Sequence, residues 1–170
     1  RFIVVEQRQE ALHLRCHDTP ETLAMWPFRW QLDVQYELHD RRVAVCYRLV
    51  NTDDNTQWCS LGSHPGFAIP LCQESGWHVH FSSARCRGPW PTHQRTLTVN
   101  DVAPAPIADV LPLRSETFAN GALYFSHAEQ QIIDVISPSG TSLIQLCTDM
   151  HPWLALWSEP GADLLCIEPL

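Results

Sequence analysis

The stretch WQLDVQYEL, residues 30–38, alternates strictly between apolar and polar side chains. A period of two residues is typical of a β-strand with one apolar face and one face in water. After the polar turn HDRR, residues 39–42, the alternation resumes in VAVCYRL, residues 43–49. Two such runs on either side of a short polar turn predict an antiparallel hairpin.

Shorter apolar or alternating runs continue this pattern along the chain, whereas no window of about 11 residues shows the stripe of a helix. These runs occupy residues 2–5, 11–16, 77–81, 122–125, 131–136, 141–147, 153–157 and 164–167. The 13 prolines oppose long helices, and five of them fall in residues 89–112, which we expect to form a long loop or crossover. We therefore predict an all-β fold, a single domain over residues 1–170 whose antiparallel strands pack as a β-sandwich.

The composition excludes several classes of function. A chain of 170 residues is long enough for one core, and its formal charge of −8 disfavours a nucleic-acid partner because phosphates would be repelled. No apolar run approaches the roughly 20 residues that span a membrane, and no GxGxxG or GxxxxGKS/T loop suggests a nucleotide cofactor. The seven cysteines form no CxxC pair, so we interpret them as reduced, buried thiols of a cytoplasmic protein.

His64 is the first candidate for chemistry, within SLGSHPGF, residues 60–67. Pro65 restricts the residue before it to extended geometry, and Gly62 and Gly66 permit a tight backbone around it. A histidine held in this way at a strand end could project into a cleft. The alternative is a loop histidine without a role.

Glu168 is the second candidate, at the end of the apolar run LLCIEP, residues 164–169. A carboxylate in such a position is partly desolvated, which raises its pKa and suits a general base. The alternative is that the strand simply ends there and the carboxylate points to water.

Two further patterns favour structural interpretations. His78 and His80 share one face of a strand, as a metal pair would need, but no Asp, Glu or Cys follows at ligand spacing. We therefore expect them to lie on the wet face, and we predict no metal site and no cofactor. Trp153 and Trp157 would share a face of their strand, where aromatic rings pack against a sugar or a core.

Four stretches together resemble the aldose 1-epimerases, or galactose mutarotase-like proteins, in particular a bacterial subgroup similar to the lactose-operon protein X. The most specific are SLGSHPGFAIPL, residues 60–71, similar to the family's GxHPxFxxPL segment, and PWLALWSEPGADLLCIEP, residues 152–169, similar to its ending. ETLAMWPF, residues 21–28, and FANGALYF, residues 118–125, add to them. The resemblance implies the later part of a galactose mutarotase-type β-sandwich.

The resemblance also implies an activity, the interconversion of the α and β anomers of an aldose. His64 matches the family histidine that donates a proton to the ring oxygen, and Glu168 matches the glutamate that takes the proton from the anomeric hydroxyl. Asn120, Trp157 and Phe67 are the candidates for substrate binding. The partner would be a monosaccharide, a hexose that is free or phosphorylated.

Departures from the family pattern keep other functions open. Gly121 follows Asn120 where the family has an acidic residue, and Leu170 stands where it has a tryptophan. The leading alternative is a non-catalytic carbohydrate-binding member of the same fold, and a more remote one is a pseudoenzyme within an assembly. Because the chain starts and stops in apolar segments, we expect residues 2–5 and 164–170 to be exposed, and the piece alone to self-associate with little activity.

Overall fold

The computed structural model describes residues 1–73, 75–82, 85–93, 96–98, 103–107, 109–114, 116–127, 130–149 and 151–170. The chain divides into two compact units, Arg1–Cys59 and Ser60–Leu170, which are described separately. That residues 1–170 form a single domain stays a prediction. Within the described residues no helix is long and apolar enough to cross a membrane.

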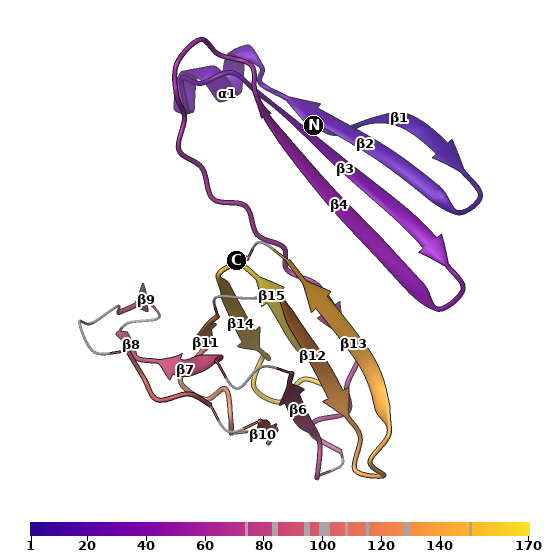
Figure 1. Ribbon diagram of the computed structural model, residues 1–170, viewed down its shortest axis with the longest axis vertical. Helices are drawn as coiled ribbons and strands as arrows, with labels where there is room; N and C mark the ends of the chain where they lie inside the picture. Colours follow the sequence, from indigo (N-terminus) through magenta and orange to yellow (C-terminus); the bar gives the residue numbers. More distant parts are fainter. Residues whose placement is uncertain are drawn as a thin grey trace. The chain divides into compact units, whose positions relative to one another are not determined.

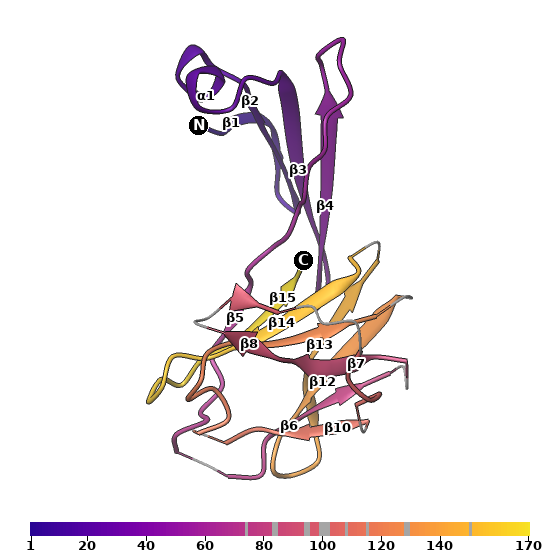
Figure 2. The ribbon, with the colours of Figure 1, turned by 90° about the vertical axis from the view of Figure 1, so that its left-hand side faces the viewer.

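The first unit is an antiparallel sheet of four strands in the order β1-β2-β3-β4 (Figure 1). The strands are β1 (Ile3–Arg8), β2 (Ala11–His17), β3 (Trp30–His39) and β4 (Arg42–Asn51). The predicted hairpin is confirmed, because β3 and β4 pair along their whole length, from Trp30 opposite Asn51 to His39 opposite Arg42 (Figure 2). Asp40 supports the tight turn with a left-handed φ of 52°.

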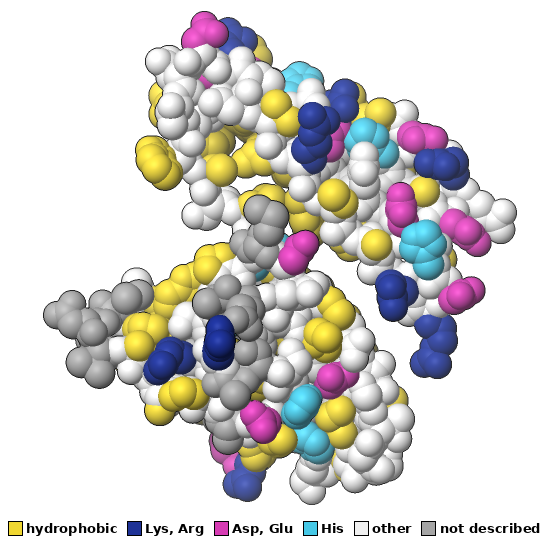
Figure 3. All heavy atoms as spheres, viewed as in Figure 1, with side chains coloured by type: hydrophobic (Ala, Val, Ile, Leu, Met, Phe, Trp, Pro, Cys, Tyr) yellow, Lys and Arg dark blue, Asp and Glu magenta, His cyan; other side chains and the backbone are white. Residues whose placement is uncertain are grey.

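The two faces of this sheet differ in polarity, as the alternation predicts. Acidic, basic and histidine side chains mix over the face that Figure 3 turns to the viewer. Asp33 departs from the expected wet position: it is only 2% exposed, because His13, Arg15 and Gln31 surround it with contacts of 2.5, 2.8 and 2.7 Å. A carboxylate can be buried in this way only when its charge is matched by such donors.

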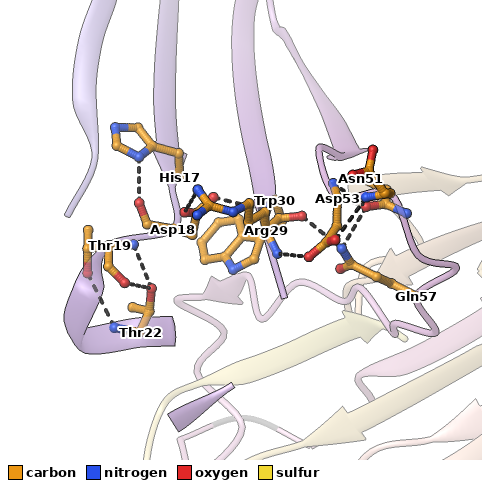
Figure 4. A network of polar contacts seen from close by, with 10 residues as sticks. His17, Asp18, Thr19, Thr22, Arg29, Trp30, Asn51, Asp53 and Gln57 are labelled. Atoms are coloured by element: carbon orange, nitrogen blue, oxygen red, sulfur yellow. Dashed lines mark hydrogen bonds and ion pairs between the residues drawn. The ribbon is translucent and has the colours of Figure 1, made fainter. Parts of the chain in front are cut away.

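A short helix, α1 (Pro20–Met25), was not expected from the sequence. Its six residues are too few to show a helical stripe, and the signal lies in its first turn instead. Thr19 and Thr22 form a reciprocal capping box, in which the backbone N–H of each residue donates to the other's hydroxyl at 2.8 and 3.3 Å (Figure 4). Nearby, the N–H of Trp30 donates to the carboxylate of Asp18 at 3.1 Å, which fixes the entry into β3.

The second unit holds two larger antiparallel sheets, in the orders β10-β6-β12-β13 and β5-β15-β14-β11-β7, and a small β8-β9 ribbon. Its strands are β5 (Gly66–Phe67), β6 (His78–Phe81), β7 (Arg87–Trp90), β8 (Thr92–His93), β9 (Thr96–Leu97), β10 (Val110–Pro112), β11 (Leu123–Ser126), β12 (Gln131–Ile136), β13 (Ser142–Thr148), β14 (Trp153–Trp157) and β15 (Leu165–Pro169).

The hydrophobic core of this unit joins side chains from both sheets, which confirms the all-β antiparallel sandwich. Phe81 of β6 packs on Phe125 of β11 with ring centroids 5.1 Å apart. Val79, Phe81 and Phe125 are at most 1% exposed. His78 and His80 alternate with the buried residues of β6 and are half-buried, so their expected place on the wetter face is confirmed.

Three expectations need correction. Residues 89–112 are not one long loop, because their described parts include strands such as β10, which pairs with β6; the segment passes from β7 in one sheet to β10 in the other, as the crossover alternative requires, and residues 94–95, 99–102 and 108 lie outside the described residues. The cysteines are not all buried: Cys86 and Cys166 are, whereas Cys46, Cys59, Cys72 and Cys147 are exposed. Residues 2–5 are exposed as expected, but Leu165, Cys166 and Ile167 are at most 3% exposed, because β15 lies inside its sheet between β5 and β14.

Candidate functional site

Glu168 lies on β15, near the middle of the five-stranded sheet. Successive side chains of β15 point to opposite faces of the sheet, as expected for a strand. Leu165 and Ile167 are fully buried and belong to the hydrophobic core, so Cys166 and Glu168 project from the opposite face of the sheet. On β14, the residue opposite Glu168 is Ala155, which is fully buried.

His64 reaches the same face through a continuation of the β5–β15 pairing. Gly66 is opposite Cys166 in that pair. Beyond it, the N–H of Ile167 donates to the carbonyl of Pro65 at 3.1 Å, and the N–H of Ser63 donates to the carbonyl of Pro169 at 2.9 Å. His64 therefore lies directly opposite Glu168, where cross-strand side chains meet.

The two side chains are in contact. The Nε2 of His64 lies 3.2 Å from the Oε1 of Glu168. The imidazole is 62% exposed, whereas the carboxylate is only 13% exposed. Burial raises the pKa of Glu168, and the charge of the neighbouring His64 opposes part of that rise. The desolvated carboxylate expected from the sequence is thus present, next to a group that can exchange a proton with it.

Gly62 explains how the SLGSHPGF segment can approach β15 so closely. A Cβ at Gly62 would lie 2.9 Å from the Cδ2 of Leu170 and 3.0 Å from the carbonyl oxygen of Pro169. Such distances are below normal van der Waals contact, so a larger residue would push the segment away. The absent side chain keeps His64 in register with Glu168.

Trp157 and Cys166 complete this face of the sheet. Trp157 is opposite Cys166 in the β14–β15 pair, and its ring meets the His64 ring edge-on, with centroids 6.2 Å apart and planes at 79°. The His64 ring therefore extends over β15 toward β14. Burial, and the charge of Glu168, raise the pKa of the Cys166 thiol.

The other two predicted binding residues are Phe67 and Asn120. Phe67 is opposite Leu165 and packs against the hydrophobic core, so its side chain lies on the inner face and its predicted contact with substrate gains no support. Asn120 is exposed in the turn before β11, three residues ahead of the Leu123–Leu156 pair. Cys166 was not recognised as a candidate, although its position two residues before Glu168 on a strand was the available signal.

The described residues contain one cluster of three side chains able to hold a metal ion, and it is His64, Cys166 and Glu168, whose ligand atoms lie within 4.8 Å of one another. His80 lies elsewhere, and its Nδ1 is 3.8 Å from the Oδ2 of Asp134 on β12. Two hollows of the described residues lie elsewhere, one beside Trp77 and Ser137 and one at the β3–β4 turn. The His64–Glu168 pair lies on a face of the sheet, with the imidazole largely exposed.

No protein-family model matches the sequence, and a search of curated proteins found no match. Solved structures do match. The galactose mutarotase related enzyme from Lactobacillus acidophilus has a TM-score of 0.86 at 23% identity, over 99% of this chain and 58% of its own. A galactose mutarotase-like protein from Lactobacillus casei has a TM-score of 0.81 at 22% identity, over 99% and 60%. Another from Clostridium acetobutylicum has a TM-score of 0.73 at 18% identity, over 99% and 55%.

These similarities show the fold, which is that of the galactose mutarotase-like proteins. The chain spans a little over half the length of the structures it matches. At this level of identity the fold alone does not determine an activity, so the function has to be argued from the site.

Proposed function

We propose that the protein carrying this chain is an aldose 1-epimerase, with His64 as the general acid and Glu168 as the general base. One observation carries the proposal: a histidine and a partly buried glutamate from neighbouring strands meet at 3.2 Å on one face of the sheet. Because each comes from a different part of the sequence, their meeting depends on the register of the sheet.

The reaction needs two proton transfers to open the ring and two to close it. Glu168 takes the proton from the anomeric hydroxyl while His64 protonates the ring oxygen, so the C1–O5 bond breaks and the open aldehyde forms. Rotation about C1–C2 presents the other face of the carbonyl. The ring oxygen then attacks C1, returns its proton to His64, and the new anomeric oxygen takes a proton from Glu168. Both side chains regain their starting states.

The contact between the two side chains supports these roles. In the ion pair, His64 carries the proton that an acid must give, and Glu168 is the anion that a base must be. A sugar has to enter between them, and His64 is the partner with freedom to move, because its side chain is 62% exposed. The Trp157 ring beside His64 offers an apolar surface to the pyranose.

The shared fold with a galactose mutarotase related enzyme and the family-like HPGF and CIEP segments support the same function. We propose a hexose as the substrate, free or phosphorylated at a position remote from C1. The chemistry involves only C1 with its hydroxyl, C2 and O5, which all aldohexoses share.

A non-catalytic sugar-binding protein is the second candidate, and Gly121 favours it. The family-like segment has an acidic residue where this chain has Gly121, and Gly121 adopts a φ of 102°, which side-chain-bearing residues rarely adopt. An acidic side chain at this position would therefore require a different turn. If that acid is needed for turnover, the chain would bind a sugar without converting it.

The test is exchange NMR between the α and β anomeric protons of glucose or galactose, with the complete gene product. Glu168→Gln keeps the shape and removes the base, so it should slow exchange by roughly 10²–10⁴-fold. Glu159→Gln, at an exposed position after β14, is the matched control and should keep the parental rate. A parent that binds sugar without accelerating exchange would favour the second candidate, and an active Glu168→Gln variant would overturn the mechanism.

A further inference from the structure

The outer face of β15 brings together three side chains of the types that hold transition metals in proteins. The ligand atoms of His64, Cys166 and Glu168 all lie within 4.8 Å of one another. Imidazole, thiolate and carboxylate are each ligands of Zn²⁺, and sulfur and nitrogen donors disfavour Mg²⁺ and Ca²⁺. The proton-transfer mechanism makes no use of the thiol.

The spacing of these atoms suits a tetrahedral ion. With bonds of roughly 2.0–2.3 Å, two ligand atoms of a tetrahedral zinc site lie about 3.3–3.8 Å apart. The separation of 3.2 Å between Nε2 of His64 and Oε1 of Glu168 is already close to that value. Because the ligand atoms lie within 4.8 Å of one another, the sulfur of Cys166 needs to approach the other two by no more than about 1–1.5 Å.

The backbone supports this geometry. Cys166 and Glu168 are two residues apart on one strand and share a face, and His64 is held opposite Glu168 by the neighbouring segment. Gly66, opposite Cys166, contributes no side chain: a Cβ there would lie 3.5 Å from the sulfur. Residue 66 therefore adds no side chain beside the thiol of Cys166, a residue that is only 3% exposed.

We propose that His64, Cys166 and Glu168 bind a divalent transition-metal ion of the Zn²⁺ type, with water as the fourth ligand, and that this ion inhibits the protein. The thiol proton and any imidazole proton pass to the solvent as the metal binds. The inhibition rests on the function proposed above, whereas the binding does not. A bound ion would occupy the lone pair of His64 and the carboxylate of Glu168, so neither could transfer a proton to or from a sugar.

Cobalt(II) is the probe for the binding step, because a thiolate ligand gives Co²⁺ a near-ultraviolet charge-transfer band and tetrahedral ligands intensify its visible bands. The metal-free, reduced protein should develop both, with one Co²⁺ per chain, and excess Zn²⁺ should remove them. Cys166→Ser should lose the charge-transfer band. Cys147→Ser, at an exposed cysteine on β13, should retain it.

A second variant guards against misfolding of Cys166→Ser. His64→Ala removes a largely exposed ligand and should weaken Co²⁺ binding by roughly 10–100-fold or more while the circular dichroism spectrum is unchanged. The proposed metal site would be wrong if the parent showed no charge-transfer band. It would also be wrong if the band persisted in Cys166→Ser.

The inhibition is measured separately by anomer exchange. In a protein that catalyses exchange, saturating Zn²⁺ should abolish most of the rate and a chelator should restore it. A full rate in the presence of bound metal would overturn the inhibition. A protein that shows the cobalt bands but no exchange under any condition would contradict the proposed function and leave the metal site supported.

Discussion

The backbone of Gly62 lies against the carbonyl oxygen of Pro169, at a distance that leaves no space for a side chain. A Cβ at Gly62 would be 3.0 Å from that oxygen. Pro169 immediately follows Glu168, and Gly62 precedes His64 by two residues. The closeness of these two backbones therefore sets the separation of His64 and Glu168.

Gly62→Ala should pull the His64 segment away from β15. We expect a loss of about 1–3 kcal/mol in the free energy of unfolding, because backbone atoms must move to admit the methyl group. The rate of anomer exchange should fall although no functional group is removed. Urea unfolding and exchange NMR measure the two effects.

Gly66→Ala is the matched control for stability. Its new methyl group would meet the Cδ1 of Leu164 at 3.1 Å, the end of a side chain that can turn away. The loss of stability should be smaller than for Gly62→Ala, and the reverse order would show that backbone contact at Gly62 is not what limits the approach.

Phe125→Ala should destabilise the second unit by about 3–5 kcal/mol. Phe125 is fully buried and packs on Phe81 of the other sheet, so its removal leaves a cavity between the two layers. Urea denaturation followed by circular dichroism measures this loss. Leu143→Ala, at a site on β13 that is 54% exposed, should change stability by less than about 0.5 kcal/mol.

Acid should weaken the first unit through Asp33. The hydrogen bond from Arg15, with others from His13 and Gln31, lowers the pKa of this carboxyl to about 2 although burial opposes the shift. The folded pKa lies below the ordinary value of 3.8, so the stabilisation is complete above that value and is lost as the pH falls towards about 2.

Asp33→Asn should therefore lower stability at neutral pH and flatten its dependence on pH in this range. Urea unfolding at several pH values between about 5 and 2 measures the slope. Asp40→Asn is the control, because Asp40 is exposed at the β3–β4 turn and asparagine tolerates the same left-handed backbone. An unchanged slope in Asp33→Asn would show that other carboxylates dominate acid unfolding.

Trp157→Ala should reduce kcat/KM for anomer exchange by roughly two- to tenfold, which corresponds to the free energy of one aromatic contact. The variant removes both the surface offered to the sugar and the edge contact to His64. Trp58→Ala, at a tryptophan that is 92% exposed in the first unit, should have no effect. Equal losses of kcat/KM in the two variants would show that Trp157 is not part of the binding site.

The long strands could be predicted from the sequence because each carries its own signal. The alternation of residues 30–38 and 43–49 located β3 and β4, and the apolar run before Glu168 located β15. In these segments the local pattern is one that a strand produces, a period of two in β3 and β4 and an apolar run in β15. The short helix α1 and strands of two to four residues, such as β5 and β10, carry too few residues to establish any period.

The candidate site was predictable in part for a related reason. His64 and Glu168 stood out because proline, glycine and apolar neighbours mark their positions locally. The cluster with Cys166 depends on which strands pair and in which register, and these pairings join distant segments. For the same reason Asp33 was expected in water, since nothing in its own strand shows that donors from β2 surround it.

The place of β15 between β5 and β14 has a consequence for the order in which the molecule is made. The ribosome synthesises His64 well before Glu168. The strand that bears Glu168, β15, must then insert between β5 and β14, which are already synthesised. The pairing with β5 joins residues as far apart in the sequence as Phe67 and Leu165, and pairings of such high contact order form slowly. Under the proposed function the site would be complete only after β15 has paired, so a nascent chain lacking this strand would possess the acid without its base.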